Sequence, residues 1–366
     1  MVDGVNDLRM HVLEAGHEQG HRPTLMLLHG FPELAFSWRQ VMPSLADAGY
    51  HVVAPDQRGY GRTTGWSPDY DADISSFRPL HLVQDVVALL TELGIESAAA
   101  VVGHDFGSPI AAWCALAAPE RFRSVVLMSA PFGGAPSAAS GSHGGRPTRA
   151  EALAALPRPR KHYLDHYRTR AADTDLSGAP QGVHAFLRAY FHHKSADWPG
   201  NQPHPLASAS ADELATLPTY YVMDLDQTMA ETVAAEMPSP AEIAANEWLP
   251  DHHLDVFAEE YGRTGFQGGL NWYRAADLGR DEMAAFHGRS IDQPSLFIAG
   301  AADWGVHQTA GLVDRMQRRA CSDLQGIHLV EGAGHWVQQE QPRVTVELLL
   351  DFLDRNGLGQ TPALDG

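Results

Sequence analysis

The sequence predicts an α/β protein in which a mostly parallel sheet, flanked by helices, is interrupted by a mainly helical insertion. Several short runs are apolar at consecutive positions, which is typical of strands that are buried on both faces. Helix-period segments separate these runs, and such an alternation favours a parallel sheet. Strand-like runs are then nearly missing from residues 151–288 and return at residue 295, which indicates an insertion into one sheet.

The elements can be placed in chain order from these patterns. The helix expected over residues 81–94 carries its leucines and valines on one face, and Gly94 supplies the stop. An amphipathic helix over residues 342–357 closes the chain. The expected strands are TLMLLHG (24–30), HVVAPDQ (51–57), AAAVVGHD (98–105), SVVLMSAPF (124–132), SLFIAGAAD (295–303) and GIHLVEGAGH (326–335).

We expect three segments along the chain. Residues 1–135 form the first part of the sheet domain, residues 136–289 form a cap domain, and residues 290–366 return to the sheet domain. The first boundary lies where the composition changes to the Gly-, Ser- and Pro-rich stretch of residues 133–149, which is typical of a flexible connection.

Charge and composition disfavour several kinds of partner. Asp and Glu outnumber Lys and Arg by 45 to 26, and the net charge of -19 repels nucleic acid and anionic membranes. Cys114 and Cys321 form no disulfide framework and fit a reducing compartment. The N-terminus resembles no signal peptide, and no apolar run is long enough to span a bilayer. We therefore expect a cytoplasmic protein, whether a monomer or a homodimer.

The motif Gly103-His104-Asp105-Phe106-Gly107 stands between a predicted strand and the helix-like stretch 109–118. A residue flanked by small neighbours in this context forms a strained elbow that exposes the central side chain as a nucleophile. The alternative is that Asp105 caps the following helix. The glycine spacing and the preceding strand favour the nucleophile.

An aspartate at this position restricts the chemistry. A serine that attacks a saturated carbon would leave an ether, whereas a carboxylate leaves an ester that water can hydrolyse. Asp105 therefore indicates an epoxide or an alkyl halide as substrate and disfavours ordinary esters.

Two further residues follow strands and are expected at the same edge of the sheet. Asp303 and His335 complete the chain order nucleophile, acid, base. We expect His335 to activate water and Asp303 to fix its tautomer and stabilise its cation. Asp323 is the competing acid, but no strand precedes it.

His29-Gly30-Phe31-Pro32 ends another predicted strand. We expect the backbone amides of Phe31 and Phe106 to donate to the oxyanion that forms during ester hydrolysis. The alternative is an ordinary turn at the end of a strand. The Phe31-Pro32 bond is a candidate for the cis form.

Together these segments resemble the epoxide hydrolase family of α/β-hydrolases. The resemblance implies the α/β-hydrolase fold and the opening of an epoxide to a vicinal diol through an ester on Asp105. It also implies substrate contacts from Pro32, Trp38, Trp272 and Trp336. The segments are HGFPE (29–33), PDQRGYGRT (55–63), GHDFGS (103–108), GFQGGLNWYR (265–274), GAADWGV (300–306) and GAGHWVQQEQP (332–342).

An epoxide oxygen needs a proton donor as the ring opens, and a neutral tyrosine suits this role. Tyr273 in LNWYR matches the tyrosine of the family's cap. KHYLDHYRTR resembles the segment that carries the second tyrosine, and the best register selects Tyr163. Tyr167, one helical turn further on, and Tyr190 are the alternatives.

Other chemistries have weaker support in the sequence. There is no HExxH motif, no Cys and His ligand cluster, no GxGxxG and no P-loop, so we expect neither a metal nor a cofactor. A haloalkane dehalogenase would share the Asp nucleophile, but these enzymes usually carry Trp where this chain has Phe106, and fluoroacetate dehalogenases carry Arg. A non-catalytic small-molecule binder is the second alternative, and the complete triad disfavours it.

Overall fold

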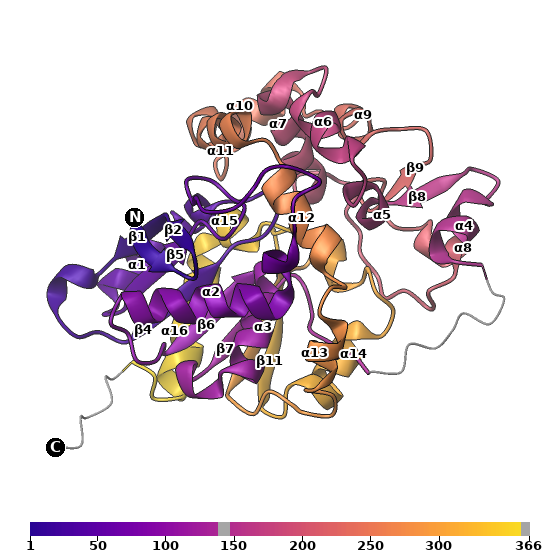
Figure 1. Ribbon diagram of the computed structural model, residues 1–366. Helices are drawn as coiled ribbons and strands as arrows, with labels where there is room; N and C mark the ends of the chain where they lie inside the picture. The colour runs from indigo at the N-terminus through magenta and orange to yellow at the C-terminus, as the bar shows by residue number, and fades with distance from the viewer. Residues whose placement is uncertain (138–146, 360–366) are drawn as a thin grey trace.

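A seven-stranded sheet forms the centre of the molecule (Figure 1). The computed structural model describes residues 1–137 and 147–359, so most of the predicted Gly- and Ser-rich connection lies outside the described residues. Neighbouring strands are parallel except β3 and β5, which are antiparallel. In spatial order the strands are β11 (Leu324–Val330), β10 (Ser295–Gly300), β7 (Val125–Met128), β6 (Ala100–His104), β4 (Thr24–Leu28), β5 (His51–Pro55) and β3 (Val12–Ala15).

Helices cover both faces of this sheet because alternate strand residues point to opposite sides. Leu25 and Leu27 pack in the layer of α1 and α16, whereas Met26 and Leu28 pack in the layer of α2 and α3. The helices of the sheet domain are α1 (Met42–Asp47), α2 (Pro79–Glu92), α3 (Gly107–Ala117), α14 (Leu312–Arg315), α15 (Val337–Glu340) and α16 (Pro342–Arg355), and the short turns are η1 (His17–Gln19), η2 (Ala35–Trp38), η3 (Ser75–Phe77), η4 (Pro119–Arg121), η5 (Trp304–Val306) and η6 (Met316–Ala320).

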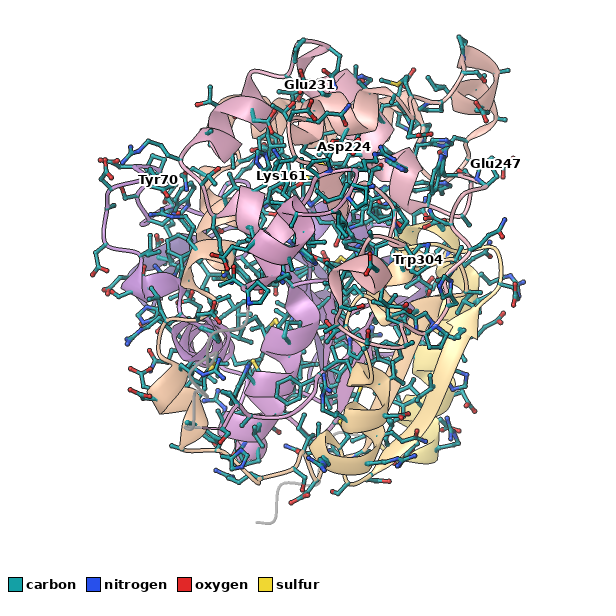
Figure 2. All side chains as sticks on the ribbon, turned by 90° about the vertical axis from the view of Figure 1, so that its right-hand side faces the viewer. Tyr70, Lys161, Asp224, Glu231, Glu247 and Trp304 are labelled. Atoms are coloured by element: carbon teal, nitrogen blue, oxygen red, sulfur yellow. The ribbon has the colours of Figure 1, made fainter. Side chains whose placement is uncertain are left out.

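A mainly helical insertion separates β7 from β10 and forms the upper part of the molecule in Figure 1. Within its described residues, the strands β8 (Arg160–His162) and β9 (Val222–Asp224) form one short antiparallel pair. Figure 2 shows Trp304 where the insertion meets the last strands of the sheet, and its ring lies 4.8 Å from that of His204. The helices are α4 (Arg149–Ala154), α5 (Tyr163–Tyr167), α6 (Ala171–Ser177), α7 (Gly182–Lys194), α8 (Ala211–Leu214), α9 (Met229–Ala234), α10 (Pro240–Ala245), α11 (Asp251–Thr264), α12 (Gln267–Ala275) and α13 (Arg280–Ala284).

A close approach of two glycines joins the insertion to the sheet domain. A Cβ atom on Gly59 or on Gly268 would lie closer than 3.0 Å to backbone atoms of the other residue. The indole N–H of Trp272 donates to the carbonyl of Arg58 at 2.8 Å, beside the same contact. The start of α12, and therefore Tyr273, is held against the loop that follows β5.

The structure confirms the predicted fold class and the six predicted strands. The N-terminal hairpin of β1 (Val2–Val5) and β2 (Leu8–Met10), together with β3, was not predicted. These strands are three or four residues long and only partly buried, so they form no apolar run. Within the described residues, no helix combines the length and the apolar character that crossing a membrane requires.

Candidate active site

Asp105 occupies a strained turn between β6 and α3. Its φ of 51° lies in the left-handed region, which a residue with a Cβ atom rarely adopts. A Cβ atom on Gly103 would clash with the backbone of Gly107, and one on Gly107 would clash with the carbonyl of Leu28. Phe106 is the N-cap of α3 and no side chain caps this helix, so Asp105 does not serve as the cap.

The carboxylate of Asp105 contacts two groups that the sequence motifs predict, the backbone amide of Phe31 and the ring of His335. The Phe31 amide donates to Oδ1 at 2.9 Å, and Nε2 of His335 lies 3.1 Å from Oδ2. Nδ1 of His335 lies 3.1 Å from Oδ1 of Asp303. A Cβ atom on Gly30 would overlap the Asp105 side chain, so the glycine leaves the space in which the carboxylate lies.

Charges around the two carboxylates keep both of them ionised. Burial alone raises the pKa of Asp105, but the hydrogen bond and charge of His335, with the charges of Lys194 and His104, hold it far below its usual range. Burial alone would also raise the pKa of Asp303, but the charge and hydrogen bond of His335 help to outweigh this effect, so the pKa of Asp303 is lowered as well. The pair therefore presents two negative groups on opposite sides of one imidazole ring.

Asp303 is held in place by the turn that it begins. It is the N-cap of η5, and its Oδ1 accepts the amide of Gly305 at 2.7 Å. Its side chain is 1% exposed, whereas the competing acid Asp323 is exposed and directly precedes β11. Asp105 follows the carboxyl end of β6, whereas Asp323 precedes the amino end of β11. Because these strands run in the same direction, the two residues lie at opposite ends of the strands.

A second buried pair supports the loop that carries His335. Nδ1 of His104 lies 2.6 Å from Oε2 of Glu33, and its Nε2 donates to the carbonyl of His335 at 2.6 Å. Burial lowers the pKa of His104, but the charge and hydrogen bond of Glu33 raise it above its usual value. Burial alone would raise the pKa of Glu33, but the charge and hydrogen bond of His104 have the larger combined effect, so the pKa of Glu33 is lowered. The Glu33 carboxylate also accepts hydrogen bonds from Gly30, Gln338 and Gln339.

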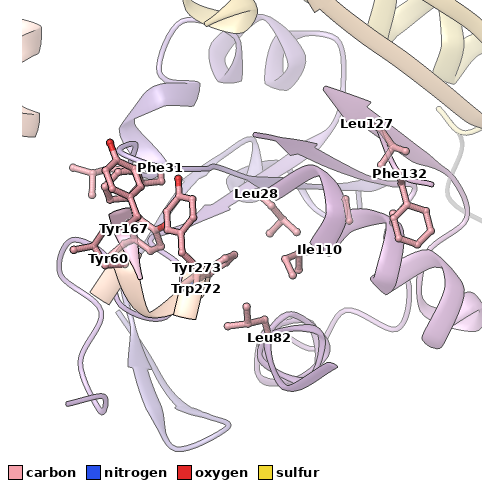
Figure 3. Packing of buried hydrophobic residues seen from close by; sticks show 14 of the residues in the cluster. Leu28, Phe31, Tyr60, Leu82, Ile110, Leu127, Phe132, Tyr167, Trp272 and Tyr273 are labelled. Carbon is pink, nitrogen blue, oxygen red and sulfur yellow. The ribbon is translucent and has the colours of Figure 1, made fainter. Parts of the chain in front are cut away.

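Aromatic side chains from the insertion pack together near the carboxylate. The rings of Tyr163 and Tyr273 lie 6.0 Å apart, and Tyr273 packs against Phe106 at 4.5 Å. Figure 3 shows Tyr273 beside Phe31 and Tyr167 at one end of the buried cluster. Burial and the negative charge of Asp105 raise the pKa of Tyr163 and of Tyr273 well above 10, so both remain neutral hydrogen-bond donors at ordinary pH.

The residues expected to contact substrate are divided between the site and the core. Trp336 lies beside His335, with ring centroids 4.7 Å apart, and Trp272 contacts Phe106 at 5.7 Å. Pro32 follows the cis Phe31-Pro32 bond, which confirms the expected isomer. Trp38 packs in the layer of α1 and α16, whereas Trp272 and Trp336 pack in the same cluster as Tyr163 and Tyr273, so its expected substrate contact stays a prediction.

Three charged residues near the site were not assigned a role from the sequence. Glu33 and His104 stand inside recognised motifs, and only the structure pairs them across 71 positions. Lys194 is 3% exposed, and its ammonium lies 5.1–5.8 Å from four aromatic rings. The adjacent sequence HHKS gives no signal of this burial. Across residues 1–137 and 147–359, no group of three or more His, Cys, Asp and Glu is arranged to hold a metal ion.

Both the sequence and the fold of this chain are similar to those of known proteins. The family model for the α/β-hydrolase fold matches residues 23–342. Epoxide hydrolase A of Mycobacterium tuberculosis is 36% identical over 96% of each chain, and an epoxide hydrolase of Caballeronia sordidicola is 32% identical over 95% of this chain and 91% of the other. The solved structure of epoxide hydrolase A from Mycobacterium thermoresistibile is 33% identical, with a TM-score of 0.73 and coverage of 95% of this chain and 96% of the other.

The buried pair of Glu33 and His104 predicts a pH-dependent contribution to stability. Glu33→Gln should lower the free energy of unfolding by about 3–5 kcal/mol near pH 5.5, because a protonated His104 loses its partner. The pKa of Glu33 is lowered, so the contribution is present above its ordinary value of 4.5 and is lost in acid. The pKa of His104 is raised, so the contribution is complete below 6.5 and declines as pH rises through the folded-state pKa.

Urea denaturation of the wild type and of Glu33→Gln, at about pH 5.5 and about pH 8.5, measures this difference. The loss of stability should be at least as large at the lower pH as at the higher. A smaller loss at the lower pH would contradict a charged pair.

Proposed function

This chain belongs to the epoxide hydrolase family of the α/β-hydrolase fold, and on that premise we propose that it hydrolyses an epoxide to a vicinal diol in two steps. The observation that carries the proposal is the Asp105 carboxylate, which contacts the Phe31 amide and His335 at once. Two neutral tyrosines from the insertion lie near enough for its charge to raise their pKa. We propose residues 136–289 as the cap domain that supplies these tyrosines.

The first step is alkylation of Asp105. Tyr163 and Tyr273 donate hydrogen bonds to the epoxide oxygen, while Oδ2 of Asp105 attacks one ring carbon. The new C–O bond forms the ester as the ring C–O bond breaks, and a tyrosine gives its proton to the released oxygen. Oδ1 remains on the Phe31 amide and becomes the carbonyl oxygen of the ester.

The second step is hydrolysis of the ester. His335 accepts a proton from water, and the hydroxyl attacks the carboxyl carbon of Asp105. The oxyanion that develops on Oδ1 is stabilised by the amides of Phe31 and Phe106. Collapse of this intermediate breaks the ester C–O bond, and His335 returns its proton to the leaving oxygen of the diol. The carboxylic acid formed on Asp105 loses its proton, which restores the carboxylate and the tyrosine that acted as donor. Asp303 stabilises the positive charge on His335 until that proton is returned.

The charge of Asp105 supports Tyr163 over Tyr167. Burial is the largest cause of the raised pKa at Tyr163, Tyr167 and Tyr273 alike, and the charge of Asp105 adds to it at Tyr163 and Tyr273, whereas at Tyr167 the next causes come from Tyr190. The hydroxyl of Tyr163 is 3.5 Å from Gln308, which is a weak contact that a substrate oxygen can replace. Tyr163 and Tyr273 therefore form the donor pair in this proposal.

Indole N–H groups near the site favour an epoxide over an alkyl halide as substrate. A dehalogenase needs donors that are free to bind the released halide. Here Trp272 donates to the carbonyl of Arg58 and Trp336 donates to the carbonyl of Phe191. Both donors are already occupied within the protein.

The activity is tested with styrene oxide, an aliphatic epoxide, a bulky polycyclic epoxide and short haloalkanes. We expect a vicinal diol from at least one epoxide and no halide release, because the site offers hydroxyl donors in place of halide ligands. Product chirality identifies the ring carbon that is attacked. Halide release without diol, or tight epoxide binding without turnover, would replace the proposal with one of its two alternatives.

Removing a tyrosine hydroxyl should slow the alkylation step in particular. Tyr163→Phe and Tyr273→Phe should each lower its rate by about 10²-fold, because a proton donor to the leaving oxygen is lost. Tyr167→Phe makes the same chemical change in the same cluster and should leave the rate close to that of the wild type. Stopped-flow tryptophan fluorescence measures the rates, and a larger loss in Tyr167→Phe than in Tyr163→Phe would reverse the assignment.

A further inference from the structure

Glu340 is a partly buried glutamate at the end of α15 that the proposed mechanism does not use. Its Oε2 accepts the amides of Gly334 at 2.9 Å and of Ala196 at 2.8 Å. Its Oε1 accepts the amide of Trp336 at 2.9 Å. Two of these amides belong to the residues on either side of His335, and the third belongs to the insertion.

The backbone of the insertion also contacts the His335 loop directly. The carbonyl of Lys194 accepts the His335 amide at 2.9 Å. A Cβ atom on Gly334 would lie closer than 3.0 Å to Ser195 and Ala196. Glu340 therefore closes a junction in which residues 194–196 of the insertion lie against the loop that carries the base.

Placing the Glu340 carboxylate in this junction costs desolvation free energy, which indicates that the carboxylate has a role there. Burial raises the pKa of Glu340 to about 8, although its three amide hydrogen bonds act to lower it. A carboxyl group in this position needs hydrogen-bond donors for both oxygens, and an apolar residue of similar size would avoid the cost of burial. What an apolar residue cannot do is fix the three amides relative to one another.

We propose that Glu340 is a positioning residue for the hydrolysis step, which holds the backbone of residues 334–336 against residues 194–196 so that the His335 ring meets the ester. The inference rests on the proposed function. Asp105 contacts His335 but also has two supports that do not pass through the His335 loop, the elbow between β6 and α3 and the Phe31 amide. Loosening the junction should therefore impair the base while leaving the nucleophile in place.

The test compares Glu340→Gln with a matched control, Glu347→Gln. Glutamine keeps the volume and one acceptor oxygen, but its NH₂ group faces at least one of the amide donors, so the junction loses a hydrogen bond. Glu347 lies on α16 with an exposed side chain that pairs with Arg343, so its substitution changes charge without touching the junction. Stopped-flow tryptophan fluorescence separates alkylation from hydrolysis when the substrate is an epoxide whose ester on Asp105 is hydrolysed slowly.

We expect the hydrolysis rate of Glu340→Gln to fall by about 10- to 10²-fold, because small displacements of a catalytic group cost this much. The alkylation rate should stay close to that of the wild type, so the ester accumulates and acid-quenched mass spectrometry detects it on Asp105. Equal losses in both steps, or no loss in either, would overturn the positioning role. Glu347→Gln should match the wild type in both steps.

Glu340→Asp provides a second variant if the glutamine variant folds poorly. The shorter side chain keeps the carboxyl group but cannot span all three amides, so the same selective loss in hydrolysis is expected, and an unchanged ratio of the two rates would overturn the inference. If the wild type itself forms no ester, the covalent mechanism fails. If it forms an ester and the ratio does not change in either variant, only the role of Glu340 fails.

Discussion

The Asp105 carboxylate at a left-handed turn is the constraint on which the rest of the site depends. A positive φ at a residue with a Cβ atom is tolerated only where the surrounding backbone leaves no other path. Here Gly30, Gly103 and Gly107 leave the space that the turn needs. The hydrogen bond from Phe31 and the contact with His335 then give the two oxygens different surroundings. In the proposed mechanism, this difference allows one oxygen to attack while the other remains in place as the carbonyl oxygen.

The base depends on backbone contacts from three directions. The carbonyl of His335 accepts hydrogen bonds from His104 and from Ser129, and its amide donates to Lys194. His104 is in turn fixed by Glu33, which belongs to the strand-end motif that also supplies the Phe31 amide. The oxyanion site, the nucleophile and the base therefore share one buried hydrogen-bond network, which explains why charged groups are retained in a core that is otherwise apolar.

The sequence was sufficient for the sheet, the elbow and the three residues Asp105, Asp303 and His335 that the fold brings together, because each depends on a local pattern. A buried parallel strand is an apolar run, and an elbow is a glycine pattern between a strand and a helix. The tyrosines were harder to choose, since Tyr163 and Tyr167 lie on one short helix and only their placement relative to Asp105 separates them. The layer of Trp38 could not be predicted either, because its motif lies next to the site in sequence while its side chain packs in the layer of α1 and α16.

Long-range pairs are what the sequence could not provide. Glu33 and His104, or Glu340 and Ala196, are recognisable only after the chain has folded, because no periodicity links positions so far apart. The short N-terminal strands were missed for a different reason. They are partly exposed and too short to form an apolar run, and pairing with their neighbours, not composition, makes them strands.

Isotope labelling in a single turnover tests the central claim, which is the ester on Asp105. With enzyme in excess over an epoxide in ¹⁸O-water, the oxygen added to the diol comes from the Asp105 carboxylate, and the water oxygen remains in the protein. We predict an unlabelled diol and one ¹⁸O atom in the peptide that contains Asp105, read by mass spectrometry. Label in the diol on the first turnover, with none in the protein, would show direct attack by water and would contradict the mechanism.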